Sequence, residues 1–173
     1  MRPSNLTSRR SGFTLIEMLV TLTIIAVVVV LVHPMMTSDA RLRMEAAVRI
    51  LVSDIEFAQS MTVGNPEQPV IVRFDPDNHR YWLAFADTPN DPLPRQGSPE
   101  PYLVRLGFGR AAMAAGVTFT ITGATDDTLE FDGFGSLERI SDRPVIRFER
   151  DGHWAEIDVS PTTGSITVTG GAD

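Results

Sequence analysis

The chain of 173 residues contains no cysteine, so no disulfide stabilises it and cysteine usage says nothing about its redox compartment. Histidine is scarce too, and His33, His79 and His153 have no metal-binding spacing such as H-x-x-x-H. The nucleophile motif G-x-S-x-G is also missing. These absences predict a protein that is not an enzyme and that holds no cofactor or metal.

Basic residues are fewer than acidic ones, with 15 Lys and Arg against 22 Asp and Glu and a net charge of −7. This balance disfavours a nucleic-acid-binding surface, which needs a basic patch to neutralise phosphates. The one arginine-rich stretch predicts a solvated face whose charges compensate each other. Its arginines alternate with acidic residues: Arg139, Arg143, Arg147 and Arg150 lie among Glu138, Asp142, Glu149 and Asp151.

Two acidic turns offer oxygen ligands of the kind that calcium uses, one at Asp75, Asp77 and Asn78 and one at Asp126 and Asp127. Neither turn has the loop length and ligand count of a recognised calcium site. Both are therefore predicted to be solvated turns.

What the chain does have is a long apolar run, FTLIEMLVTLTIIAVVVVLV, from Phe13 to Val32. Twenty residues are about enough to cross the hydrocarbon core of a bilayer as a helix. Glu17 is the only ionisable residue in the run. A carboxylate inside a membrane segment is costly and usually marks a function and a partner, so Glu17 is the first candidate functional residue.

The residues before this run are basic, with Arg2, Arg9 and Arg10 and no acidic side chain. The positive-inside tendency keeps such an end in the cytoplasm. We therefore expect a single-pass protein of the inner (cytoplasmic) membrane, with the N-terminus cytoplasmic and the C-terminal domain periplasmic or extracellular.

The segment Ser11-Gly12-Phe13-Thr14-Leu15-Ile16-Glu17 closely resembles the processing site of type IV prepilins and of the pseudopilins of type II secretion. The resemblance implies that a prepilin peptidase removes leader residues 1–12 by cutting after Gly12 and that the new amine of Phe13 is then methylated. Glu17 would be the fifth mature residue and would pair with the N-terminal amine of a neighbouring subunit during assembly. The implied partners are the peptidase, other pilins or pseudopilins, and a membrane assembly platform.

Two other interpretations of this arm stay open. One is a cleaved secretory signal peptide with an exit site at Ser38-Asp39-Ala40, although Glu17 and the length of the run are atypical of such a segment. The other is a plain membrane anchor, which explains the length but leaves the spacing of Gly12, Phe13 and Glu17 to coincidence.

After the apolar run, Pro34 is predicted to kink or interrupt the helix, because proline lacks a backbone donor and clashes with the preceding turn. The alternative is that Pro34 ends the membrane helix. Ser38 or Asp39 can then cap an amphipathic helix that runs to about Val63, before the stop signal Gly64-Asn65-Pro66. One apolar stripe recurs along this helix at spacings of three and four, predicting a face that packs on a sheet: Met44, Ala47, Val48, Leu51, Ile55 and Ala58.

The rest of the chain reads as short strands. The clearest pair is 145–150 with 153–159, because Asp151-Gly152 favours a two-residue type I′ turn. That turn sets Phe148 opposite Ala155, Ile146 opposite Ile157, Arg147 opposite Glu156 and Glu149 opposite Trp154. A second hairpin joins 70–74 to 81–85, and its hydrophobic faces match only if the loop has an even number of residues. Weaker strands are predicted at 102–106, 117–122, 129–131 and 166–169.

These elements predict an α+β fold, in which a long N-terminal helical spine packs on an antiparallel β-sheet or sandwich domain. The predicted division is a leader at 1–12, a transmembrane and assembly helix at 13–36, an amphipathic half of the spine at 37–64 and a β-rich domain at 65–173. The proline-rich stretch 87–101 is either a partner-recognition loop or a variable solvated insertion, with Leu93 and Arg95 as its possible anchors.

A fainter resemblance covers the end of the amphipathic helix, LVSDIEFAQSMTVGNPEQPVIVRF, and two later glycine-containing segments, LEFDGFGSL and IDVSPTTGSITV. These are similar to H-type pseudopilins and FimT-like minor pilins. That class implies a helix on two small antiparallel sheets, with Thr163-Gly164-Ser165-Ile166 as a late turn and strand. The expected function is that of a minor pseudopilin or pilin subunit in a type II secretion pseudopilus or a type IV pilus-like filament. The alternatives are a membrane-anchored binding module that never polymerises and a DNA-binding FimT-like minor pilin.

Overall fold

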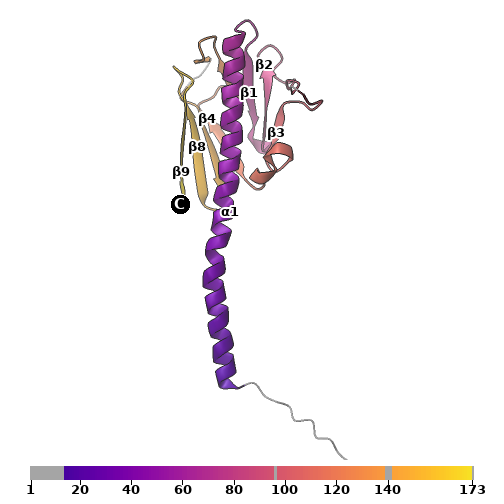
Figure 1. Ribbon diagram of the computed structural model, residues 1–173. Coiled ribbons are helices and arrows are strands. Elements are labelled where there is room, and N and C mark those ends of the chain that lie inside the picture. Colours follow the sequence, from indigo (N-terminus) through magenta and orange to yellow (C-terminus); the bar gives the residue numbers. More distant parts are fainter. Residues whose placement is uncertain (1–13, 96, 139–141, 173) are drawn as a thin grey trace, which may run out of the picture. The chain divides into compact units, whose positions relative to one another are not determined.

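The computed structural model describes residues 14–95, 97–138 and 142–172, and for residues 30–38 it describes the helical backbone but not the side chains. The chain divides into two compact units, Met1–Ser38 and Asp39–Asp173. The C-terminal half of the long helix belongs to the same unit as all the strands (Figure 1).

Helix α1 runs without a break from Leu15–Gly64 and ends at the predicted stop signal. The expected helix start at Ser38 or Asp39 is wrong, because a helix that continues through these residues has no free N–H groups there to cap. The carboxylate of Asp39 instead accepts a hydrogen bond from Arg43, with Nε and Oδ2 2.8 Å apart. Pro34 neither ends nor interrupts α1; a kink at this residue stays a prediction.

Two antiparallel sheets follow α1. The first has the strand order β3-β2-β1-β5-β6 and the second β4-β7-β8-β9. The strands of the first sheet are β1 (Val70–Asp75), β2 (Arg80–Phe85), β3 (Leu103–Arg105), β5 (Thr128–Phe131) and β6 (Leu137–Glu138). Those of the second are β4 (Thr118–Thr122), β7 (Val145–Arg150), β8 (His153–Val159) and β9 (Ile166–Ala172). Two short 3₁₀ helices, η1 (Pro76–Asn78) and η2 (Gly109–Ala114), lie in the connections.

The β7–β8 hairpin has the predicted register in all four residue pairs, including Phe148 opposite Ala155 and Arg147 opposite Glu156. Asp151 and Gly152 both have positive φ, 49° and 75°, as a type I′ turn requires. The β1–β2 hairpin is confirmed as well: Asp75 pairs with Arg80, which leaves a loop of four residues, 76–79.

One hydrophobic core joins α1 to both sheets. The whole predicted stripe of α1, from Met44 to Ala58, is buried in it. Phe74 of the first sheet meets Phe119 of the second edge to face, with ring centroids 6.0 Å apart. In Figure 1 the strands β8 and β9 lie along one side of this part of α1, and β2 and β3 lie along the other. The predicted α+β fold, a helix packed on antiparallel sheets as in pilins, is therefore confirmed.

Candidate functional site

The N-terminal part of α1 presents apolar side chains outward. Every described side chain from residue 14 to residue 29 is exposed, so none is buried by packing within this chain. The large apolar members are Leu15, Ile16, Met18, Leu19, Val20, Leu22, Ile24, Ile25, Val27, Val28 and Val29. A helix that is apolar all round belongs in a large core or in a membrane, so this stretch, named the assembly segment here, needs an apolar environment from outside the chain.

Hydrogen bonds within the assembly segment satisfy its hydroxyl groups. Thr14 stands before the first helical residue, and its Oγ1 accepts the backbone N–H of Glu17 at 3.3 Å, as an N-cap does. The hydroxyls of Thr21 and Thr23 donate to the carbonyls of Met18 and Leu19, at 2.9 and 2.8 Å. Such bonds to the preceding turn let a hydroxyl sit in an apolar environment without an unmet donor.

Glu17 is different, because its carboxylate has no hydrogen-bond or ion-pair partner among the described residues. The sequence Thr14-x-x-Glu17 matches a capping box, in which each of the two side chains accepts a hydrogen bond from the backbone N–H of the other residue. Here the Thr14 side chain accepts from the Glu17 N–H, but the Glu17 side chain does not accept from the Thr14 N–H. The carboxylate therefore remains available to an external cation or N–H donor. Its place in the first turn suits an anion, since the helix N-terminus carries partial positive charge.

The structure covers only part of the predicted processing region. Gly12 and Phe13 lie outside the described residues, and the side chains of residues 30–38, which include Pro34 and the end of the predicted membrane run, are not described. Within the part of the chain that is described, no helical stretch is both long enough and apolar enough to cross a membrane.

A buried carboxylate at Asp54 is the main feature that sequence reasoning missed. Only 1% of this charged residue is exposed. Its oxygens accept hydrogen bonds from the hydroxyls of Tyr81, at 2.6 Å, and Tyr102, at 2.8 Å, and from the guanidinium of Arg110. Burial raises the pKa of Tyr81 well above its usual value, so this hydroxyl stays a donor. The cluster ties α1 to β2 and η2 and has a structural role.

Gln59 joins the two segments that resemble minor pilins. Its Nε2 donates to the carbonyl of Gly135 at 2.7 Å and reaches that of Thr163 at 3.5 Å. Ser136 Oγ adds a bond of 2.6 Å to the carbonyl of Thr162. Gly164 has φ 63°, and a Cβ there would lie 2.1 Å from the Gly135 carbonyl oxygen. The turn before β9 therefore requires glycine for its backbone and for its packing.

Of the two predicted anchors of the 87–101 loop, Leu93 is buried and Arg95 makes a contact at the surface. Leu93 is buried, its N–H donates to the carbonyl of Leu83 at 2.7 Å, and its own carbonyl accepts from Tyr102 at 2.6 Å. The guanidinium of Arg95 lies over the Tyr102 ring at 5.2 Å. Beside them is a pocket of about 510 Å³, lined by Phe57, Met61, Phe85, Leu93, Pro94, Arg95 and Tyr102.

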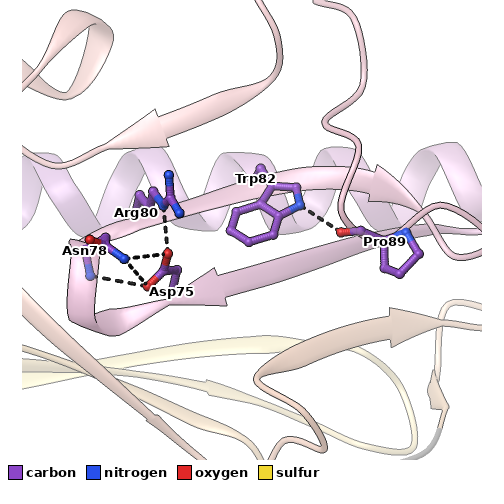
Figure 2. A network of polar contacts seen from close by, with 5 residues as sticks. All are labelled: Asp75, Asn78, Arg80, Trp82 and Pro89. Atoms are coloured by element: carbon purple, nitrogen blue, oxygen red, sulfur yellow. Dashed lines mark hydrogen bonds and ion pairs between the residues drawn. The ribbon is translucent and has the colours of Figure 1, made fainter.

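The acidic turn at Asp75 is satisfied by the protein itself, as Figure 2 shows. Asp75 accepts hydrogen bonds from Arg80 Nε at 2.7 Å and from the side-chain amide of Asn78 at 2.9 Å. Trp82, on the same strand as Arg80, donates from Nε1 to the carbonyl of Pro89 at 2.9 Å and so holds the start of the loop. Among the described residues, no group of three His, Asp or Glu side chains could hold a metal ion.

In a comparison with protein families, residues 7–32 match the family described as "Prokaryotic N-terminal methylation motif". No curated protein and no solved structure matches the chain. The matched stretch contains Gly12, Phe13 and Glu17. The motif is typical of type IV prepilin-like proteins, which are structural and not enzymatic, and it indicates processing by a prepilin peptidase, N-methylation, membrane anchoring and assembly with other pilin-like subunits.

Proposed function

We propose that this chain is a minor subunit of a type II secretion pseudopilus or a related type IV pilus-like filament, and that it works in protein secretion. The observation that carries the proposal is Glu17, whose carboxylate has no partner among the described residues, whereas the hydroxyls of Thr14, Thr21 and Thr23 in the same stretch all take part in hydrogen bonds. The methylation motif in residues 7–32 supports it from an independent direction. The H-type or FimT-like subtype is part of the proposal and stands on the resemblance of the two glycine-containing segments.

The first step is processing at the cytoplasmic face of the inner membrane. A prepilin peptidase hydrolyses the bond between Gly12 and Phe13, and the amine of Phe13 is then methylated. Thr14 stays in the mature chain as its second residue, so the cap on the Glu17 N–H survives cleavage. Gly12→Leu should block processing because the bulky side chain crowds the scissile bond, whereas Gly12→Ala should be partly tolerated.

The second step is assembly. The assembly segment moves from lipid into a bundle of like helices, where its apolar side chains pack against those of neighbouring subunits. Lipid tails are as apolar as these side chains, so packing and polar contacts drive the association. Glu17 supplies the polar contact by pairing with the N-terminal amine of a neighbour. An unpaired charge near the middle of a bilayer costs about 2.5–3.5 kcal/mol on insertion scales. The cost is smaller for Glu17, which lies near the start of the apolar run, and it still favours the paired state.

The β domain then lies on the outer face of the membrane, where it docks partners. DNA capture, the FimT-like alternative, receives no support from the arginine-rich stretch. Arg143 pairs with Asp158 at 2.6 Å, and Arg147 pairs with Glu149 and Glu156 at 2.6 and 2.8 Å. Arg139 lies outside the described residues. Arginines already neutralised by carboxylates are poor phosphate ligands.

The test is the variant Glu17→Val, compared with Glu17→Gln and with Leu19→Val as a matched control. We expect all three chains to insert in the membrane and to be cut after Gly12, since none of them changes that bond. Glu17→Val and Glu17→Gln should lose crosslinks to neighbouring subunits and secretion activity, whereas Leu19→Val should keep both. Normal filament function in Glu17→Val would refute the role of the carboxylate and favour a non-polymerising membrane-anchored module.

A further inference from the structure

Strand β9 presents an unprotected edge. It pairs with β8 on one side, and no described strand pairs with its other side. Its sequence, Ile-Thr-Val-Thr-Gly-Gly-Ala, has neither a charge nor a proline. Natural sheets usually blunt an exposed edge with short strands, charges or proline. The first sheet follows that rule, because its edge strands β3 and β6 have only three and two residues. In the second sheet, the other edge strand, β4, contacts η1.

An apolar groove of about 720 Å³ runs between β9 and α1. On its helix side, Met44, Val48 and Val52 supply apolar side chains at intervals of four residues. Val168 lies on its strand side and is 48% exposed. Val168 is directly opposite Ile157, which is fully buried, so the two side chains share the core face of the sheet. The helix therefore covers the core face of β8 and leaves that of β9 open. In Figure 1, β9 lies at the outer side of the strands beside α1.

We propose that this groove receives an extended strand of another polypeptide, which pairs with the free edge of β9 and continues the second sheet. Main-chain hydrogen bonds along β9 give the affinity in this mode of recognition, and pockets for alternate side chains give the specificity. Alternate side chains of the added strand would lie between Val168 and the apolar row on α1. The unpaired backbone edge of β9 and the open apolar row on α1 are two separate observations. A single added strand would pair with the edge and cover the row.

The rim of the groove also specifies charge. Arg49 and Glu56 both line it, and neither has an ion-pair or hydrogen-bond partner among the described residues. They are two turns apart on α1, which is about 10 Å. A partner strand with an acidic group toward Arg49 and a basic group toward Glu56 complements both charges, and this order fixes the direction of the strand.

A second copy of this chain does not fit the groove. This conclusion rests on the membrane anchoring and assembly in the proposed function. Antiparallel pairing of two β9 strands sets residues 39–64 of the two α1 helices in opposite directions, which does not fit the bundle of like helices in the proposed function. Parallel pairing about a two-fold axis puts the two helices on opposite faces of the joined sheet. The second copy then presents Thr167, Thr169 and Gly171 to the groove, which are not the apolar side chains that the groove requires.

The test uses the full chain in detergent micelles and a capped eight-residue synthetic peptide that alternates valine with threonine and carries one aspartate and one arginine. A peptide of the same composition with its valines contiguous is the probe control. Backbone-amide and methyl NMR shifts report the site, and a titration gives the Kd. The variant Val168→Lys puts a charge on the edge at an exposed position, and Thr120→Lys makes the same change on β4 as a matched control.

We expect the alternating peptide to shift the amides of β9 and the methyls of Val48 and Val52. Val168→Lys should weaken its binding at least about tenfold, or 1.4 kcal/mol, while Thr120→Lys leaves it unchanged. The proposal is overturned if neither peptide binds, if both bind equally, or if Val168→Lys has no effect. It is also overturned if the chain forms a dimer that Val168→Lys dissociates, since the edge would then belong to a second copy. N-terminal processing does not enter this measurement, so the two proposals fail separately.

Discussion

Tyr81 of β2 donates a hydrogen bond of 2.6 Å to the carboxylate of Asp54 on α1, a residue 27 positions earlier in the chain. Both residues are shielded from solvent, since Asp54 and Tyr81 are each only 1% exposed. Tyr102 and Arg110 complete the set of donors around the carboxylate. The packing of α1 on the first sheet therefore depends on a polar contact inside the core as well as on the apolar stripe.

Replacing Asp54 by alanine leaves the Tyr81 hydroxyl and the Arg110 guanidinium without their acceptor. Breaking a buried ion pair from one side costs about 3–5 kcal/mol of unfolding free energy. Tyr81→Phe removes only one donor to the charged carboxylate and should cost less, about 1.5–3 kcal/mol. Chemical denaturation followed by circular dichroism measures both, with Glu67→Ala at an exposed turn as the control, expected within about 0.5 kcal/mol of the wild type. An Asp54→Ala variant as stable as that control would show that the cluster adds nothing.

Asp75 makes stability depend on pH. Burial raises the pKa of this carboxyl, but hydrogen bonds from Arg80 and Asn78 outweigh that effect and lower the pKa below its usual 3.8. A carboxyl with a lowered folded-state pKa stabilises the fold above its unfolded-state pKa, and the contribution is lost as pH falls through the folded-state value. The stability difference between wild type and Asp75→Asn should therefore be constant near pH 6 and shrink below about pH 4. Denaturant titrations across this range check the trend, and a difference that does not change with pH would contradict it.

Gly164→Ala should be far more destabilising than Gly152→Ala. Both glycines have positive φ, 63° and 75°, which costs an alanine about 1–2 kcal/mol in either position. A Cβ at Gly152 meets nothing within 4 Å, whereas one at Gly164 meets the Gly135 carbonyl oxygen at 2.1 Å and Gln59 Nε2 at 2.2 Å. Melting temperatures of the two variants separate the backbone cost from the clash. Equal losses would mean that the contact between the two turns is not needed.

The sequence was most informative where two local signals agreed. The Asp151-Gly152 turn and the alternation on both sides of it predicted four residue pairs of the β7–β8 hairpin, and all four have the observed register. In the β1–β2 hairpin, the face alternation required an even loop, and the four residues of 76–79 meet that requirement. The apolar stripe on α1 was visible because core packing repeats with the helix period.

Features built by distant residues could not be predicted in this way. Nothing local in the sequence indicates that Asp54 is buried, because the donors that explain its burial, Tyr81, Tyr102 and Arg110, lie 27 to 56 residues away. The expected cap at Asp39 failed for another reason, since a capping residue has no role inside a continuous helix. The short elements η2 and β6 carry too few residues for a periodic pattern. At the candidate site, the sequence singled out Glu17, but the unsatisfied state of its carboxylate emerged only from the hydrogen bonds of Thr14, Thr21 and Thr23.

The central claim is that the chain is processed and assembled as a pilin-like subunit, and N-terminal mass spectrometry of the protein from its native membranes tests it most directly. The account predicts a mature chain that starts at Phe13 with a methylated amine. An unprocessed start at Met1 would contradict it and indicate a simple anchor, and a start near Arg41 would contradict it by indicating a cleaved signal peptide and a secreted β domain.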